Sequence, residues 1–464
     1  MDLGHLVSGG EISNEEDSHG HSDRYFEVYT SSGSRKSESL FLEKDDDADG
    51  HPYSGWEEEE EEEYGEEEAL VGIRFTQKDI AIGQLCFFFV GFTPFILQNA
   101  FLAEVAFWVN HTPEGRAIGT SITTAFVLGN LCSLFAMIIP MKMPSLSDRH
   151  LLVALDLAAL LICFLIAVFW DADFDTNTSW VIIILSFLAG GVGNVSTLTL
   201  FSFVASYTHQ MTYASNLGAG FSGLFAGLFA ILQRPSDPNY YPFWFFLIIA
   251  ELILMGLIAF MLGAWSETGS NLRIYIVEEN MMINDQTTRF PKLDLDTFKA
   301  GALPLFYMFW MMCVAYLIPP LVPYLSRHDT PDMIAYLYTL YLLGAPLGSA
   351  ASSAIGHHFY KTIWVSGILQ TFFAIYLLVS CLNAVDLGLP YWLCYLGTFF
   401  TAFIMGFNTT SIYLYIRSKY KDHLASLSFM AVIVGQFGAL TGVIIQDILI
   451  SQDAYDDGYS VGVA

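Results

Sequence analysis

Apolar residues fall into eleven long runs along this chain, and short polar stretches separate the runs. Each run reaches the length of about 20 residues that an α-helix needs to cross the hydrocarbon core of a membrane. We therefore expect an all-α, polytopic membrane protein with eleven spans. The predicted spans are residues 80–109, 118–140, 150–170, 180–205, 213–232, 240–265, 299–325, 332–356, 362–382, 391–416 and 427–450.

The longest polar connection between spans, residues 266–298, divides them into six and five. This division predicts two helical bundles with a substrate site between them, the arrangement of major-facilitator-type carriers. The expected parts are a six-helix bundle over 78–265, a cytoplasmic loop over 266–298, a five-helix bundle over 299–450 and a short outward tail over 451–464.

The basic residues predict the orientation, because Lys and Arg are retained on the cytoplasmic side of a membrane. Beyond the first 73 residues, twelve of them lie on the side of the N-terminus and only Arg116, Arg234 and Arg327 on the other. The N-terminus is therefore expected in the cytoplasm. The sequons at Asn110 and Asn177 fall in the first two outward loops, where we expect glycosylation. The expected location is the plasma membrane, with an endolysosomal membrane as the alternative.

The N-terminal tail, residues 1–73, carries 23 acidic and 4 basic side chains, including an unbroken glutamate run over 57–63. Such a segment has too little apolar surface to offset its ordering entropy, so we expect it to be disordered. It supplies most of the net charge of −28, which therefore says little about a ligand. Tyr25-Phe26-Glu27-Val28 fits a tyrosine-type sorting signal, so sorting adaptors are candidate partners of the tail.

The composition favours a carrier over an enzyme. Only 14% of the residues are charged, against about 25% in a soluble domain. An intramembrane enzyme needs clustered catalytic groups at membrane depth, and we find no such cluster in the sequence. We expect a small-molecule substrate and a lipid bilayer as partners, and no nucleic acid, metal or cofactor. The cysteines lack metal-ligand spacing; they are Cys86, Cys132, Cys163, Cys313, Cys381 and Cys394.

Prolines interrupt the first span of each predicted half. Pro94 lies in the first span, and Pro319, Pro320 and Pro323 lie in the seventh. Broken helices at corresponding positions of the two halves are a sequence indicator of the binding site in carriers of this type. We therefore expect both spans to be interrupted near a substrate site.

Small residues recur at helical spacing in three of the spans. Such residues let helix backbones approach closely inside a membrane, so we predict close helix packing at these positions. They are Gly223 and Gly227 in the fifth span, Gly344, Gly348, Ser352 and Gly356 in the eighth, and Gly438 and Gly442 in the eleventh.

Polar side chains within the spans are the candidates for substrate binding, because each needs a partner in hydrocarbon. An amide both donates and accepts, which suits a neutral heterocycle or a sugar hydroxyl; hydrogen bonding between helices is the alternative role. The predicted cavity-lining amides are Asn99, Asn130, Asn194 and Gln436, and Asn216 and Asn408 are further buried amides.

Two carboxylates lie deep within the predicted spans. Glu104 is in the outer half of the first span, and Glu251 is near the centre of the sixth. We expect both to orient the buried amides or to respond to protons, and Glu104 to belong to the substrate site. Asp156 and Asp447 lie nearer to span ends and are expected to reach water.

The first two spans resemble the start of the riboflavin transporter family at matching spacing. The residues that match are Asn99, Glu104, Pro113-Glu114-Gly115 and Leu128-Gly129-Asn130, whereas Arg116 stands where the family has a tryptophan. Further similarities are Asn194-Val195-Ser196, Gly218-Ala219-Gly220-Phe221-Ser222 and Gln436-x-Gly438-x-Leu440-x-Gly442. The resemblance implies eleven spans, a cytoplasmic N-terminus and a riboflavin-like, planar heterocyclic nutrient moved by alternating access.

Two other families of the same architecture give alternative predictions. Phe87-Phe88 through Gly91 to Asn99 also looks like the equilibrative nucleoside transporters. The charged Asp-x-x-Gly-Arg of their eighth span would fall on Ala345-Pro346-Leu347-Gly348-Ser349 and is absent. Spans four, five and eight are similar to battenin, a lysosomal membrane protein. A nucleoside or nucleobase carrier and a battenin-like protein therefore remain as alternatives.

Overall fold

The computed structural model describes residues 77–136, 148–172, 178–204, 207, 209–265, 295–325, 331–355, 363–381, 392–420 and 423–451. The predicted tail over 1–73, the sorting signal, Asn177 and residues 452–464 lie outside the described residues. So do residues 266–294 of the predicted cytoplasmic loop.

The described part of the chain is helical and contains no strand. Eleven stretches are long and apolar enough to cross a membrane, which confirms the predicted eleven spans. The first half contains α2 (Gln77–His111), the short η1 (Gly115–Ala117), α3 (Ile118–Ala136), α5 (Asp148–Phe169), α6 (Trp180–Val204), α7 (His209–Gln233) and α8 (Pro242–Trp265). The second half contains α10 (Leu295–Ala300), α11 (Ala302–Tyr316), α12 (Ile318–Leu325), α13 (Pro331–Ile355), α14 (Ile363–Cys381), α15 (Trp392–Lys419) and α16 (Leu424–Ser451).

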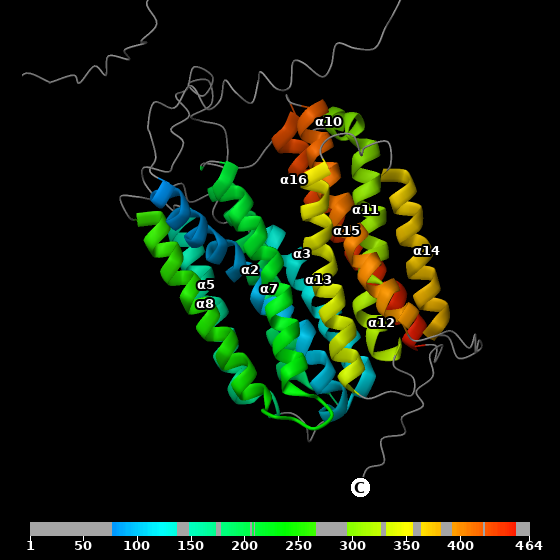
Figure 1. Ribbon diagram of the computed structural model, residues 1–464. Coiled ribbons are helices and arrows are strands. Elements are labelled where there is room, and N and C mark those ends of the chain that lie inside the picture. The colour runs from blue at the N-terminus through cyan, green and yellow to red at the C-terminus, as the bar shows by residue number, and fades with distance from the viewer. Residues whose placement is uncertain are drawn as a thin grey trace, which may run out of the picture. The chain divides into compact units, whose positions relative to one another are not determined.

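The two halves repeat one pattern of helix packing (Figure 1). Helix α2 packs on α7 as α11 packs on α16, and α3 packs on α6 as α13 packs on α15. Helix α5 likewise packs on α6 as α14 packs on α15. Among the described helices, α8, which packs on α2 and α5, has no counterpart in the second half. The internal repeat is typical of transporters built from two related bundles.

Helices approach most closely where a glycine faces a neighbouring backbone. A Cβ atom at Gly218 of α7 would lie 1.8 Å from the Phe88 carbonyl oxygen of α2, and one at Gly348 of α13 would lie 1.8 Å from that of Phe403 in α15. A Cβ atom at Gly438 would lie 2.3 Å from the Phe309 carbonyl oxygen. These contacts confirm that the predicted stripes of small residues pack helices together.

Helix α2 continues through Pro94, so the predicted interruption of the first span is wrong. Proline has no backbone N–H and leaves the carbonyl four residues earlier, that of Val90, without its helical donor. The Thr93 hydroxyl donates to this oxygen at 3.2 Å. A side-chain donor of this kind lets a membrane helix accommodate a proline without breaking.

Replacing Gly348 by alanine is expected to destabilise the protein by about 1–3 kcal/mol, because the added methyl overlaps the Phe403 carbonyl and must displace the backbone of α15. The matched control is Gly367→Ala in α14, where an added Cβ atom meets nothing within 4 Å. Thermal unfolding in detergent should show a clear decrease in Tm for Gly348→Ala only. Equal Tm values for the two variants would contradict the close packing of α13 on α15.

Candidate substrate-binding site

The seventh span is broken, as predicted, between the end of α11 at Tyr316 and the start of α12 at Ile318. Pro319 and Pro323 leave the carbonyl oxygens four residues earlier without helical donors. The Tyr338 hydroxyl of α13 donates to the Pro319 oxygen at 2.7 Å, and that of Tyr341 to the Ala315 oxygen at 3.4 Å. Helix α13 therefore supplies donors that the prolines remove.

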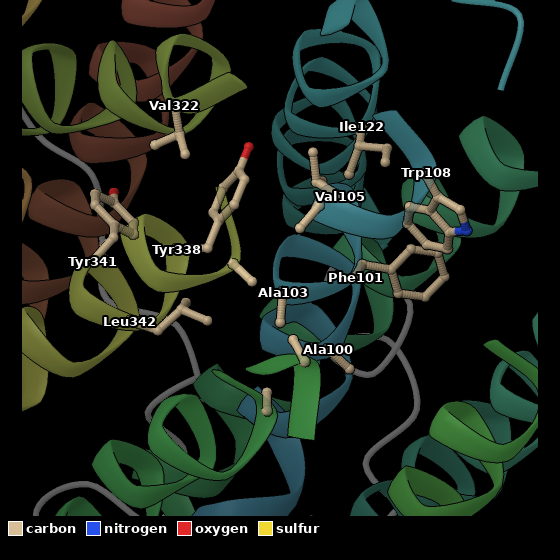
Figure 2. Packing of buried hydrophobic residues seen from close by; sticks show 14 of the residues in the cluster. Ala100, Phe101, Ala103, Val105, Trp108, Ile122, Val322, Tyr338, Tyr341 and Leu342 are labelled. Carbon is tan, nitrogen blue, oxygen red and sulfur yellow. The ribbon is translucent and has the colours of Figure 1, made fainter. Parts of the chain in front are cut away.

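The broken helix lies at the contact between the two halves. Figure 2 shows Tyr338 between Val322 of α12 and Val105 of α2. A Cβ atom at Gly119 of α3 would lie 2.9 Å from Pro323 and 3.2 Å from the Tyr338 hydroxyl. Helix α3 of the first half therefore packs directly on the break in the second half.

Helices α7 and α13 form the longest contact between the halves and lie side by side in Figure 1. Helix α13 packs against a face of α7 that carries glycines. A Cβ atom at Gly223 would lie 2.8 Å from the Leu342 carbonyl oxygen, and a Cβ atom at Gly227 would lie 2.6 Å from the Thr339 hydroxyl. A Cβ atom at Gly220 would lie 2.4 Å from Pro346, and this contact is near the middle of both helices.

A polar contact closes one end of this interface. The Ser236 N–H, just after α7, donates to the Asp332 carboxylate at the start of α13 at 3.2 Å. We call the end of the bundle that holds this contact and the turn between α2 and α3 the joined end.

Helices α3 and α16 also connect the halves near the joined end. The Thr124 hydroxyl donates to the Asp447 carboxylate, with distances of 3.2 and 3.5 Å to its two oxygens. Val127 packs with Ala439 and Val443 of α16. Asp447, expected to reach water, is partly buried at this interface.

Glu104 is fully buried and bonds to the last residue of α7. The Gln233 side-chain amide donates to its Oε1 at 2.8 Å, whereas its Oε2 has no hydrogen-bond partner among the described residues. Tyr240, in the turn after α7, donates its hydroxyl to the Phe229 carbonyl. Burial raises the pKa of the Tyr240 phenol, and the Glu104 carboxylate raises it further, so Tyr240 keeps its proton at neutral pH.

Asn99 also bonds to α7, about one and a half turns from Glu104 along α2. Its side-chain amide donates to the Ser222 hydroxyl at 2.8 Å, and Ser222 donates to the Ala219 carbonyl at 2.6 Å. The side chain of Asn99 is only half-buried. The two predicted site residues on α2 therefore both have their hydrogen-bond partners on α7.

Asn130 and Asn194 lie together between α3 and α6. The Asn194 amide donates to the Asn130 carbonyl at 3.1 Å and to the Ser133 hydroxyl at 2.6 Å. Both asparagines are at most 9% exposed, and this geometry matches the alternative role of joining helices. Gln436 is on α16, in the other half, and its Oε1 has no hydrogen-bond partner among the described residues.

Other polar positions differ from expectation. Glu251 is exposed on the outer face of α8 and bonds to none of the amides it was expected to orient, and Asn216 is exposed rather than buried. Asn408, in contrast, is buried as predicted and accepts a 2.6 Å hydrogen bond from Ser366. Asp156, expected to reach water, is 5% exposed and has Thr93 as a hydrogen-bonding neighbour. Whether such a side chain is buried depends on the rotation of its helix about the helix axis. This rotation cannot be predicted from a span that is apolar on all sides and has few polar residues.

Gln233 and Glu114 make contacts that the sequence did not predict. Gln233 is the last residue of α7 and lies one residue beyond the predicted span over 213–232. Glu114 of the Pro-Glu-Gly turn accepts hydrogen bonds from the backbone N–H and the hydroxyl of Ser179, the latter at 2.8 Å, at the start of α6. A carboxylate there complements the helix N-terminus. Asn110 is exposed in the last turn of α2, and its glycosylation stays a prediction.

The fold defines the class of protein, a multi-pass membrane protein whose two helical halves have the arrangement of major-facilitator-type carriers. Two solved structures are similar. The crystal structure of a mutant of the nucleoside transporter NupG has a TM-score of 0.54 and 13% identity, over 81% of this chain and 93% of that one. The crystal structure of a bacterial homolog of the human lysosomal transporter Spinster, inward-facing and unoccupied, has a TM-score of 0.53 and 11% identity. The match covers 82% of this chain and 85% of that one.

The family model for solute carrier family 52, riboflavin transporter, matches residues 80–237. This match covers α2 to α7 and confirms the predicted resemblance to the riboflavin transporter family in that part of the chain. No curated protein matches the sequence.

Replacing Tyr338 by phenylalanine is expected to destabilise the protein by about 1–3 kcal/mol, because the Pro319 carbonyl loses its donor and stays buried. The matched control is Tyr336→Phe, which removes an exposed hydroxyl from the same helix. Thermal unfolding should show the loss for Tyr338→Phe alone. An unchanged Tm for Tyr338→Phe would mean that the broken helix does not depend on this bond.

Proposed function

We propose that this protein carries a riboflavin-like, planar and uncharged heterocyclic nutrient across a membrane by alternating access. The observation that carries the proposal is the family match, because the matched segment contains Asn99, Glu104 and the two α7 side chains that bond to them. The nucleoside transporter alternative shares the fold, and the test below separates the two substrates.

In this proposal Asn99 and Glu104 bind the ligand together with Gln436. An amide side chain matches the alternating N–H and C=O groups of a heterocyclic imide. Asn99 is the best placed of the predicted amides, because its side chain is half-buried and its neighbour Ser222 fixes its orientation. Asn194 donates to the backbone carbonyl of Asn130 and so joins α6 to α3. Both asparagines would support the site rather than touch the ligand.

Alternating access would require the joined end to open. With the N-terminus in the cytoplasm, as we propose, the joined end would face outward, and its contacts would close the carrier to the outside. The glycine face of α7 presents no side chains to α13, which would let the halves part without disrupting interdigitated packing. We further propose a plasma-membrane location, glycosylation at Asn110 and Asn177, and binding of sorting adaptors to the tail.

Radiolabelled riboflavin and uridine uptake tests the substrate and the site together. Wild-type protein in proteoliposomes should show saturable riboflavin flux, which an intramembrane enzyme would not show. Asn99→Ala and Glu104→Gln should each lower riboflavin uptake by about tenfold, the effect of losing one hydrogen bond of about 1.4 kcal/mol. The control Asn216→Ala, an exposed amide on α7, should transport as wild type.

Unchanged uptake in both Asn99→Ala and Glu104→Gln would remove these residues from the site. Saturable uptake of uridine but not riboflavin would replace riboflavin with nucleosides as the substrate. The absence of flux for both compounds would contradict the proposed substrate class.

A further inference from the structure

Glu251 is a carboxyl group at the centre of the bilayer that faces away from its own protein. The span of α8 runs from Pro242 to Gly263, and Glu251 lies near its midpoint on an exposed face. Its neighbours on this face, at helical spacing, are large apolar side chains that are about half exposed: Trp244 56%, Met255 50%, Ile258 50% and Leu262 58%.

A polar group in this position needs a partner from outside the chain. Intramembrane carboxyl groups almost always face a bundle interior and pair with another polar group, since lipid tails offer no hydrogen bonds. Among the described residues no side chain bonds to Glu251. The neighbouring apolar residues of α8 are compatible with contact to lipid, whereas the carboxyl group of Glu251 is not.

The chain itself limits which partner fits. In the described spans, Lys and Arg occur only at the ends, at Arg116 and Arg149, so a second copy offers no cation at the depth of Glu251. A second copy does offer the same carboxyl group at the same depth. Two carboxyl groups that carry their protons are self-complementary, because each O–H donates to the other's carbonyl oxygen.

We propose that two copies of this protein associate through α8, with Glu251 of each copy paired across a two-fold axis. A two-fold interface brings each residue near the axis against its own equivalent, which the carboxyl pair requires. Met255 and Ile258 pack around the pair and exclude lipid from it. The interface uses the outer face of α8, away from Asn99 and Glu104, so it is independent of the proposed transport site.

Single-molecule photobleaching of the full-length chain in dilute proteoliposomes tests the association. Wild type should show two bleaching steps. Glu251→Leu, which fills the face with an apolar side chain, should weaken dimerisation by tenfold or more, whereas Glu251→Gln, whose amide is also self-complementary, should stay within about threefold of wild type. Because the side chain faces outward, Glu251→Leu should fold with an unchanged or higher Tm.

Cysteine cross-linking locates the interface. In a background with Cys86 and Cys132 replaced by serine, Met255→Cys should form a cross-linked dimer on oxidation. The control Phe372→Cys, at a position on α14 that is at least as exposed as Met255, should form none. A monomeric wild type, a Glu251→Leu variant as dimeric as wild type, or equal cross-linking at both positions would overturn the proposal.

Discussion

Helix α7 packs between α2 and α13, and its glycines make both of these contacts close. Gly218 lets α7 press against the backbone of α2, and the glycine face at Gly223 and Gly227 lets it press against α13 in the other half. The same helix carries Ser222 and Gln233, the partners of Asn99 and Glu104. A shift of α7 relative to α13 would therefore move the hydrogen-bond partners of Asn99 and Glu104, which links the contact between the halves to the proposed substrate site.

A separate constraint is that hydrocarbon offers no donors to backbone carbonyls. At Pro94 one hydroxyl, that of Thr93, suffices and the helix continues. In the seventh span several prolines lie close together and the helix breaks. The donors to its carbonyl oxygens come from other helices: tyrosines of α13 donate to the Pro319 and Ala315 oxygens, and Gln446 of α16 donates to the Leu317 oxygen at 3.0 Å. The geometry of the break thus depends on the helices that pack against it.

Length and apolarity were enough to predict the eleven spans, because a bilayer imposes both on every crossing helix. The stripes of small residues were also predictable, since helical spacing places them on one face. The rotation of each helix was not: Glu251 and Asn216 face outward and Asp156 inward, although their sequence surroundings are equally apolar. The bond of Glu104 to Gln233 joins residues far apart in the chain and could not be read from either segment alone.

The proposed alternating access requires that the halves separate at the joined end during each transport cycle. A disulfide between Ser236→Cys and Asp332→Cys, positions that the structure places in hydrogen-bonding contact, would hold this end closed. We expect the oxidised double variant to lose substrate uptake and to recover it on reduction, while each single variant transports normally. Full uptake by protein that is shown to be completely cross-linked would contradict the opening of this interface.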